Sequence, residues 1–322
     1  MIGSVVDTPI LLHIGYHKTG SSWLQRELFN MPRAWDSTSG ERSSPDAVSF
    51  AAPWSRRDIA RWLVWDDPLV FDAEEARRFF MKRLSTLTGS LVPVISYERL
   101  SGLPQFGGYD GPEVAERLVQ VFPSARVLIV VREQASMLVS LWKGYIQRGG
   151  IRPLSGFVSQ QFGSSSLGPR AQHLLYHRLI AHYRELFGPM NVLVLPFEQL
   201  VRDPGAFTAA VTTFAKTDQR PHRMDRSREN PSLSSAGAAV TRFLNLAIVP
   251  VDVDGYPQPR LSSRVVSVVK TVDRMLFHLV PHSDHRRLEG TVASLLGDTY
   301  AESNTRTALL TGIDLKSYGY VC

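Results

Sequence analysis

Short apolar runs alternate with longer amphipathic stretches through much of the chain. The apolar runs, which are typical of buried strands, cover residues 9–14, Val92–Tyr97, Arg126–Val131 and Asn191–Pro196. Helical patterns cover residues 23–29, Pro112–Phe122, Gln134–Arg148 and Pro169–Phe187, and another helix begins at Asp72 and stops before Gly89. Apolar strands that alternate with helices favour a parallel sheet with both faces covered. The pattern therefore predicts an α/β fold with a central parallel sheet flanked by helices.

Strand patterns end near residue 197, and helical patterns dominate from there to the end of the chain. They cover roughly residues 204–216, 234–247, 262–279 and 286–309, by the periodicity of their apolar positions. Residues 31–57 are polar and irregular, which predicts an exposed excursion. Because no repeat, low-complexity tract or linker interrupts the chain, we expect a single domain over residues 1–322 with a helical C-terminal part from about residue 204.

Composition narrows the class of protein. Cys322 is the only cysteine, so neither an internal disulfide nor a cysteine-based zinc site can form. No signal sequence is visible and no apolar run approaches the roughly 20 residues that a membrane span needs, which favours a cytoplasmic protein. The net charge of +6 is spread evenly along the chain. An even, mildly basic charge favours an anionic ligand over nucleic acid, which usually selects a concentrated basic stripe.

A glycine-rich segment follows the first predicted strand and precedes a helix. Gly15 and Gly20 have the spacing of the nucleotide-binding pattern G-x-x-x-x-G-K-[ST], but Ser21 occupies the lysine position and Lys18 precedes the second glycine. A strand, loop and helix start still make an anion site, because amides at a helix start have no partner within the helix. The segment therefore predicts a phosphate-binding loop that differs from an NTPase loop.

The segment Tyr16-His-Lys-Thr-Gly-Ser-Ser-Trp23 resembles the 5′-phosphosulfate loop of the sulfotransferases that use 3′-phosphoadenosine 5′-phosphosulfate (PAPS). It departs from that family's pattern, Y-P-K-[ST]-G-[TS]-[TS]-W, at His17. A second element, residues 127–145, resembles the family's 3′-phosphate element, in which a strand ends in Arg132 and Ser140 follows in the next helix. Weaker similarities to bacterial members extend from residue 191 to the C-terminus. The resemblance implies a P-loop-like sulfotransferase fold and an enzyme that needs PAPS and no metal, and that releases adenosine 3′,5′-bisphosphate.

The same resemblance assigns roles to residues of both elements. Lys18 would contact the bridging oxygen and offset the charge that grows on the departing phosphate, and Trp23 would stack on adenine. Amides and hydroxyls of the loop would bind the 5′-phosphosulfate, and an arginine and a serine would bind the 3′-phosphate. A later loop would close over the same phosphate. These cofactor-binding positions are Lys18, Thr19, Gly20, Ser21, Ser22, Trp23, Arg132, Ser140, Arg226, Arg228 and Asn230.

Sulfuryl transfer to a hydroxyl also needs a general base within hydrogen-bond reach of the acceptor proton. Glu98 is the first choice, since it follows the strand Val92–Tyr97, after which relatives place their catalytic histidine. The alternative for this side chain is a pairing with Arg99 or with a neighbouring helix. His17, beside the phosphate loop, is the second candidate for the base and Glu41 the third.

The acceptor is a hydroxyl-bearing molecule whose class the sequence indicates only through an aromatic and basic segment. Tryptophans and arginines suit a sugar, so we expect a carbohydrate or glycoconjugate acceptor; the segment holds Trp35, Trp54, Trp62, Trp65, Arg33, Arg56, Arg57 and Arg61. Tryptophans are also common in cores, which leaves open a small-molecule or lipid sulfotransferase. A P-loop kinase and a non-catalytic nucleotide-binding protein are further alternatives. Residues 264–280 form a basic amphipathic helix that suits either peripheral membrane contact or packing on the sheet.

Overall fold

The structure is a computed structural model, and it describes residues 10–29, 31, 50–85, 87, 91–104, 107–160, 169–217, 233–248, 271 and 283–322. The chain divides into two compact units, which are described separately here. The first comprises Met1–Glu133, Gln172–Glu229 and Ala301–Cys322, and the second comprises Gln134–Ala171 and Asn230–Tyr300. The single domain expected from the sequence stays a prediction.

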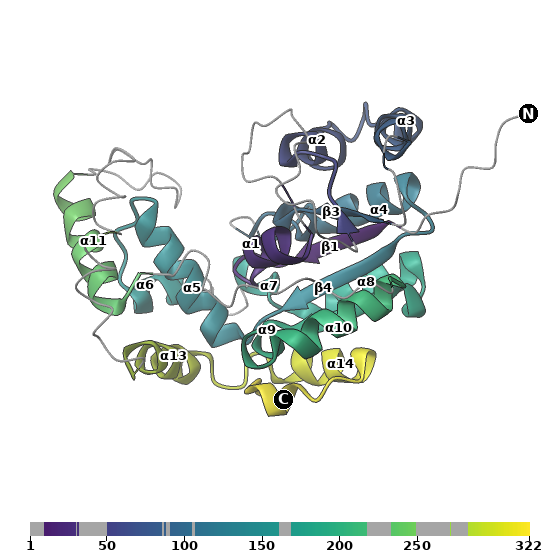
Figure 1. The fold of residues 1–322 in the computed structure, drawn as a ribbon. Helices are drawn as coiled ribbons and strands as arrows, with labels where there is room; N and C mark the ends of the chain where they lie inside the picture. The colour runs from purple at the N-terminus through teal and green to yellow at the C-terminus, as the bar shows by residue number, and fades with distance from the viewer. Residues whose placement is uncertain are drawn as a thin grey trace, which may run out of the picture. The chain divides into compact units, whose positions relative to one another are not determined.

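The first unit holds a parallel sheet of five strands in the order β2-β3-β1-β4-β5. Its strands are β1 (Leu11–Gly15), β2 (Phe50–Ala51), β3 (Val92–Ser96), β4 (Arg126–Val131) and β5 (Val192–Pro196), of which β1, β3 and β4 lie side by side in Figure 1. The four strands expected from apolar runs are confirmed. Sequence patterns missed β2, because a strand of two residues is too short to show a period.

Helical segments surround this sheet. In the first unit they are α1 (Ser21–Trp23), η1 (Leu24–Leu28), α2 (Arg56–Ala60), η2 (Arg61–Trp65), α3 (Ala73–Leu84), η3 (Glu98–Ser101), α4 (Gly111–Val121), α8 (Tyr176–Phe187), η5 (Pro189–Asn191), α9 (Phe197–Arg202), α10 (Pro204–Ala215), α14 (Ala301–Thr311) and η6 (Leu315–Tyr318). The second unit contains α5 (Gln134–Gln147), α6 (Leu154–Ser159), α11 (Ser235–Ile248) and α13 (Ser283–Leu296), while α7 (Pro169–Gln172) spans the boundary in sequence.

Strand side chains alternate between two buried faces of the sheet. On one face Leu11, Val94 and Leu128 form a core cluster with residues of η1 and α10, among them Leu24 and Phe207. Their sequence neighbours on β1 and β4 point to the other face and are buried as well, and α8 packs against β4 and β5. Burial on both faces is what a parallel sheet requires, and it confirms the predicted α/β class.

Two expected helices are broken. The pattern over Pro169–Phe187 forms α7 and α8, which are separated by a turn at His173 and Leu174, both of them buried. The pattern over residues 286–309 forms α13 and α14, separated by a turn in which Gly297 has a φ of 52°. Past residue 204 the described residues are helical, without a strand. Most of the excursion 31–57 and of the helices at 262–279 and 264–280 lies outside the described residues.

The strand order predicts a ligand site at one edge of the sheet, where the carboxyl ends of the strands lie. Strand β1 has β3 on one side and β4 on the other, so the chain changes its direction of winding around β1. In open parallel sheets, ligands bind at the carboxyl ends of the strands where the winding reverses. The loop after β1, η3 after β3, Arg132 after β4 and α9 after β5 all begin at this edge.

Candidate active site

The loop after β1 has a tightly specified backbone. Lys18 and Gly20 both have positive φ angles, 70° and 81°. Thr19 is buried, and its hydroxyl donates to the carbonyl of Tyr16 at 2.5 Å. The carbonyl of Gly20 accepts from the amide of Trp23 at 2.9 Å, which closes the first turn of the helical run that begins at Ser21. The loop therefore has one defined shape before any ligand binds.

This loop offers an anion several donors. The amides of Thr19 and Gly20 form no turn or loop hydrogen bond with a backbone carbonyl of the described residues. The hydroxyl of Ser21 is buried and has no hydrogen-bond partner there either. Lys18 and Ser22 are exposed. Backbone amides, a hydroxyl and an ammonium group in one loop suit a phosphate or sulfate, whereas the hydroxyl of Thr19 already holds the loop together.

Trp23 lies at the other end of the loop. It is partly buried and packs against the core cluster around Leu24 and Leu28. The packing fixes one part of the indole ring in the core. Its expected stacking on adenine stays a prediction.

Arg132 connects β4 to the loop. Its guanidinium donates to the carbonyl of Lys18 at 2.8 Å and lies 4.7 Å from the centre of the Phe197 ring. The side chain is buried, so a positive charge lies beneath the loop beside an aromatic face. Sequence patterns identified Arg132 but not its contact with Lys18, which depends on the pairing of β1 with β4.

Three of the sequence-identified positions of the 3′-phosphate site, and one candidate base, cannot be placed. Arg226, Arg228 and Asn230, and likewise Glu41, lie outside the described residues. Ser140 is on α5 and is partly exposed, but α5 belongs to the second unit. A joint role of Arg132 and Ser140 therefore stays a prediction.

A half-buried carboxylate just beyond β5 was given no role from the sequence. Glu198 accepts a hydrogen bond from the amide of Glu133 at 2.9 Å and another from the hydroxyl of Tyr320 at 3.2 Å. Burial raises the pKa of Glu198, while the hydrogen bond from Glu133 opposes that change. These contacts hold the segment after Arg132 in place. The only sequence signal was the position of Glu198 just past a strand.

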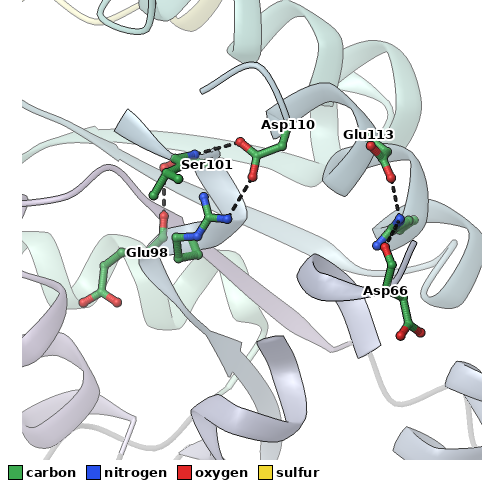
Figure 2. Close-up of polar contacts among 8 residues, drawn as sticks. Asp66, Glu98, Ser101, Asp110 and Glu113 are labelled. Carbon is green, nitrogen blue, oxygen red and sulfur yellow. Dashed lines mark hydrogen bonds and ion pairs between the residues drawn. The ribbon is translucent and has the colours of Figure 1, made fainter. Parts of the chain in front are cut away.

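Glu98 is the first residue of η3, directly beyond β3 and next to β1. Figure 2 shows its carboxylate pointing away from Asp110 and Ser101. Arg99 pairs with Asp110 at 3.0 Å, so the alternative of a Glu98–Arg99 ion pair is wrong. Among the described residues, no side chain pairs with the Glu98 carboxylate. It is half-buried, and its role as the base stays a prediction.

His17 is also half-buried and precedes Lys18 in the loop. The neighbouring Tyr16 is buried against the rings of His173 and Tyr176, with centroid distances of 4.8 Å to each. This aromatic packing fixes the start of the loop. The role of His17 as the second candidate for the base stays a prediction.

The aromatic segment splits between core and surface. Trp54 is buried against Phe80 and belongs to the core, which corrects its assignment to a sugar surface. Trp62 packs on Phe79, with the Arg61 guanidinium 5.3 Å from its ring centre, and Trp65 is 57% exposed. Trp35 and Arg33 lie outside the described residues. The remaining aromatic side chains are on η2, an element that packs next to η3.

The described part of the chain contains no cluster of three or more His, Cys, Asp or Glu side chains that could hold a metal ion. None of the helices that the structure describes is long and apolar enough to cross a bilayer.

Comparisons with known proteins place the chain in a family. The model of the sulfotransferase family matches residues 9–221. A sulfotransferase from Alicyclobacillus acidocaldarius is 18% identical, with 74% of this chain and 92% of that chain covered and a TM-score of 0.44. The sulfotransferase domain of the curacin biosynthetic pathway is 15% identical, with coverages of 89% and 97% and a TM-score of 0.41.

A mouse sulfotransferase, SULT7A1, whose structure is a complex with PAP, is 11% identical; 94% of this chain and 88% of that chain are covered, with a TM-score of 0.36. No curated protein sequence matches the chain. The family model spans well over half of the chain and includes the whole sheet with the loop after β1. The chain therefore belongs to the sulfotransferase family, whose members transfer sulfuryl groups.

Proposed function

We propose that this enzyme transfers a sulfuryl group from PAPS to a hydroxyl of an acceptor. The observation that carries the proposal is the juxtaposition of a loop suited to an anion after β1 with the Glu98 carboxylate after the neighbouring β3; no side chain of the described residues pairs with that carboxylate. Membership of the sulfotransferase family supports the same reaction. The donor supplies a sulfuryl group whose bond to the 5′-phosphate breaks as the acceptor oxygen bonds to sulfur.

The loop residues fit the charged end of this donor. Amides of Thr19 and Gly20, the buried hydroxyl of Ser21 and the exposed hydroxyl of Ser22 bind the 5′-phosphosulfate. Lys18 supplies a positive charge beside the bond that breaks, where preorganised charge stabilises the transition state. Trp23 stacks on the adenine.

Arg132 and Ser140 bind the 3′-phosphate in this proposal. The Arg132 guanidinium donates to Lys18, and its planar fork of donors has the geometry that suits a phosphate. The later loop with Arg226, Arg228 and Asn230 completes the same phosphate site. Because Arg132 touches the Lys18 backbone, binding at the 3′ end also fixes the residue that acts at the sulfuryl group.

Glu98 takes the proton of the acceptor hydroxyl as its oxygen attacks sulfur. Its carboxylate has no ion-pair partner among the described residues, and η3, which begins at Glu98, packs next to η2. Arg61, Trp62 and Trp65 on η2 favour a carbohydrate or glycoconjugate acceptor, since aromatic faces and guanidinium groups suit sugars. A small-molecule or lipid acceptor is the alternative. The single cysteine, Cys322, is in keeping with a cytoplasmic location.

Calorimetric titration of the purified chain tests the donor. We expect adenosine 3′,5′-bisphosphate to bind without metal and more tightly than ATP with Mg²⁺, because the site has donors for a 3′-phosphate. Arg132→Ala should reduce this preference for the 3′-phosphate. Tighter binding of ATP with Mg²⁺ would support the P-loop kinase instead, and binding of neither nucleotide would contradict the proposal.

Release of adenosine 3′,5′-bisphosphate from PAPS tests catalysis with a panel of sugars, phenols and lipid alcohols. Glu98→Gln should lower kcat by roughly 10²–10⁴-fold with little change in KM for PAPS, since it removes a base without removing a cofactor contact. The matched control is Glu116→Gln on the exposed face of α4, which should leave kcat unchanged. An unchanged kcat in Glu98→Gln would move the role of base to His17 or Glu41.

Lys18→Ala tests the second charged group of this reaction. We expect kcat to fall by roughly 10²–10³-fold, because the lysine acts where charge develops in the transition state. Binding of adenosine 3′,5′-bisphosphate should weaken much less, since the loop amides and hydroxyls remain. A loss of binding as large as the loss of turnover would contradict this division of roles.

A further inference from the structure

The peptide group between Arg132 and Glu133 is held at both of its polar ends. Its carbonyl oxygen, which belongs to Arg132, accepts from the hydroxyl of Tyr176 at 2.6 Å. Its N–H, which belongs to Glu133, donates to Oε1 of Glu198 at 2.9 Å. A trans peptide group is planar, with its carbonyl and its N–H on opposite sides. Because β4 fixes the backbone before Arg132, these two hydrogen bonds set the direction in which the Arg132 side chain leaves the chain.

The segment after β5 contacts both the side chain of Arg132 and the backbone that follows it. Strands β4 and β5 pair in parallel, with their last residues opposite each other, so the segments after the two strands begin side by side. The ring of Phe197 lies 4.7 Å from the Arg132 guanidinium, and the next residue, Glu198, accepts from the amide of Glu133. All of these residues belong to the first unit.

The carboxylate of Glu198 is itself held by the C-terminal segment. The hydroxyl of Tyr320 donates to its Oε2 at 3.2 Å, so each carboxylate oxygen has a donor. Tyr320 is buried, and burial raises the pKa of its hydroxyl well above the ordinary value, so the hydroxyl keeps the proton that it donates. The same segment is tied to α14, where Nδ2 of Asn304 donates to the carbonyl of Val321 at 2.8 Å.

The charge and the geometry of Glu198 act in opposite directions on an anion beside Arg132. The positive charge of Arg132 opposes the rise in the pKa of Glu198, so the two side chains interact electrostatically. A carboxylate near Arg132 repels a phosphate, and its charge alone would therefore weaken binding. Its oxygens, in contrast, fix the backbone that carries Arg132. Removal of the carboxylate thus has opposite effects under the two roles.

We propose that Glu198 is a positioning residue of the 3′-phosphate site, whose carboxylate, held by Tyr320, fixes the peptide group after Arg132 and so keeps the Arg132 guanidinium in place for the 3′-phosphate. The C-terminal segment thereby takes part in donor recognition without touching the donor. The proposal rests on the proposed function, in which Arg132 binds the 3′-phosphate of PAPS. A side chain that is held in place before the ligand arrives loses less conformational freedom on binding, which raises affinity.

The preference for a 3′-phosphate tests this role. It is the ratio of the dissociation constants of adenosine 5′-monophosphate and adenosine 3′,5′-bisphosphate, measured by calorimetry. Glu198→Ala should lower this preference by at least about five-fold, because the bisphosphate loses affinity and the monophosphate does not. Glu198→Gln keeps an acceptor for the Glu133 amide without the charge, and should retain at least about the wild-type preference. A higher preference in Glu198→Ala, or an equal loss in both variants, would overturn the proposal.

Tyr320→Phe tests the contribution of the C-terminal segment. It removes only the hydroxyl that donates to Glu198 and should lower the preference by about two- to five-fold. The matched control is Tyr318→Phe in the same segment, which keeps the ring that lies against Arg202 and should leave the preference unchanged. In a Glu198→Ala background, Tyr320→Phe should have less than about a two-fold further effect. The same loss in both backgrounds would show that Tyr320 does not act through Glu198.

A second background shows whether Glu198 acts through Arg132. Arg132→Ala should remove most of the preference, and Glu198→Ala added to it should change the remainder by less than about two-fold. An undiminished effect of Glu198→Ala in this background would overturn the proposal. Hydrogen exchange of the Glu133 amide needs no ligand and should be faster in Glu198→Ala than in Glu198→Gln. Equal exchange in the two variants would show that the carboxylate does not hold this peptide group.

These outcomes separate the two proposals. If the wild-type chain does not prefer the bisphosphate, the proposed donor site is wrong, and this inference fails with it. If the wild type shows the preference and Arg132→Ala loses it, but Glu198→Ala keeps it, only this inference is wrong. Urea unfolding identifies variants that do not fold. If Glu198→Ala is among them, Tyr320→Phe, measured with and without Arg132→Ala, takes its place.

Discussion

Gly15 shows what a single residue decides at this site. Position 15 has no room for a side chain, since Ser21 Oγ and His13 Nε2 lie where its Cβ would be. Gly20 is constrained differently, through its positive φ of 81°. The sequence marks both as glycines of a phosphate loop, but it does not distinguish the two reasons. Only the structure shows that Ser21 Oγ and His13 Nε2 lie where a side chain at Gly15 would be.

At this scale we predict that Gly15→Ala weakens binding of adenosine 3′,5′-bisphosphate by at least about ten-fold, because a contact under 3 Å must displace the donors of the loop. Calorimetry measures the change. The matched control is Gly290→Ala in α13, where an added Cβ meets nothing within 4 Å; it should leave binding unchanged. Equal affinity in Gly15→Ala and the wild type would contradict the crowding above Gly15.

Some helices begin where a strong local sequence signal predicts them. The start of α3 was expected at Asp72, and the structure confirms it: Asp72 Oδ1 accepts from the amides of Glu74 and Glu75 at 2.9 Å each. The ends of other helices have no such local signal and go with tertiary contacts instead. The break between α7 and α8 has no proline or glycine within it, and it places His173 against Tyr16.

For α3 we expect Asp72→Ala to lower the free energy of unfolding by about 1 kcal/mol, through the loss of a side-chain N-cap. Asp72→Asn keeps a capping oxygen and should remain within a few tenths of a kcal/mol of the wild type, by the similar capping preference of the two residues. Urea denaturation followed by circular dichroism measures both. An equal loss in the two variants would mean that the charge, and not the cap, stabilises this end.

For the whole molecule, two buried histidines couple folding to pH. Burial lowers the pKa of His13 to about 3 and that of His173 to about 4, from 6.5. Both rings bind a proton more readily in the unfolded chain, so the free energy of unfolding falls as the pH drops below 6.5. The raised pKa of Glu198 acts in the opposite sense, with stability falling as the pH rises between its ordinary and its raised pKa.

The two histidines together should account for about 4 kcal/mol of stability lost between pH 7 and pH 5, since one pKa unit corresponds to 1.36 kcal/mol. His173→Gln should remove about half of this dependence, because one of the two groups is gone. Urea unfolding midpoints across this pH range measure the slope. The same slope in the wild type and in His173→Gln would show that His173 does not resist protonation in the folded chain.

The sequence by itself determined four of the five strands and placed Lys18, Glu98 and Arg132 in the segments that follow three of them, because periodicity and motif spacing are local properties of the chain. Tertiary structure decided which partners these segments meet: Arg99 pairs with Asp110, and no side chain of the described residues pairs with Glu98. The hydrogen bond of His13 with Ser96 likewise depends on the register of β1 against β3, which pairs these two residues directly. Residues 83 positions apart come into contact only when the sheet forms, and no local pattern encodes that register.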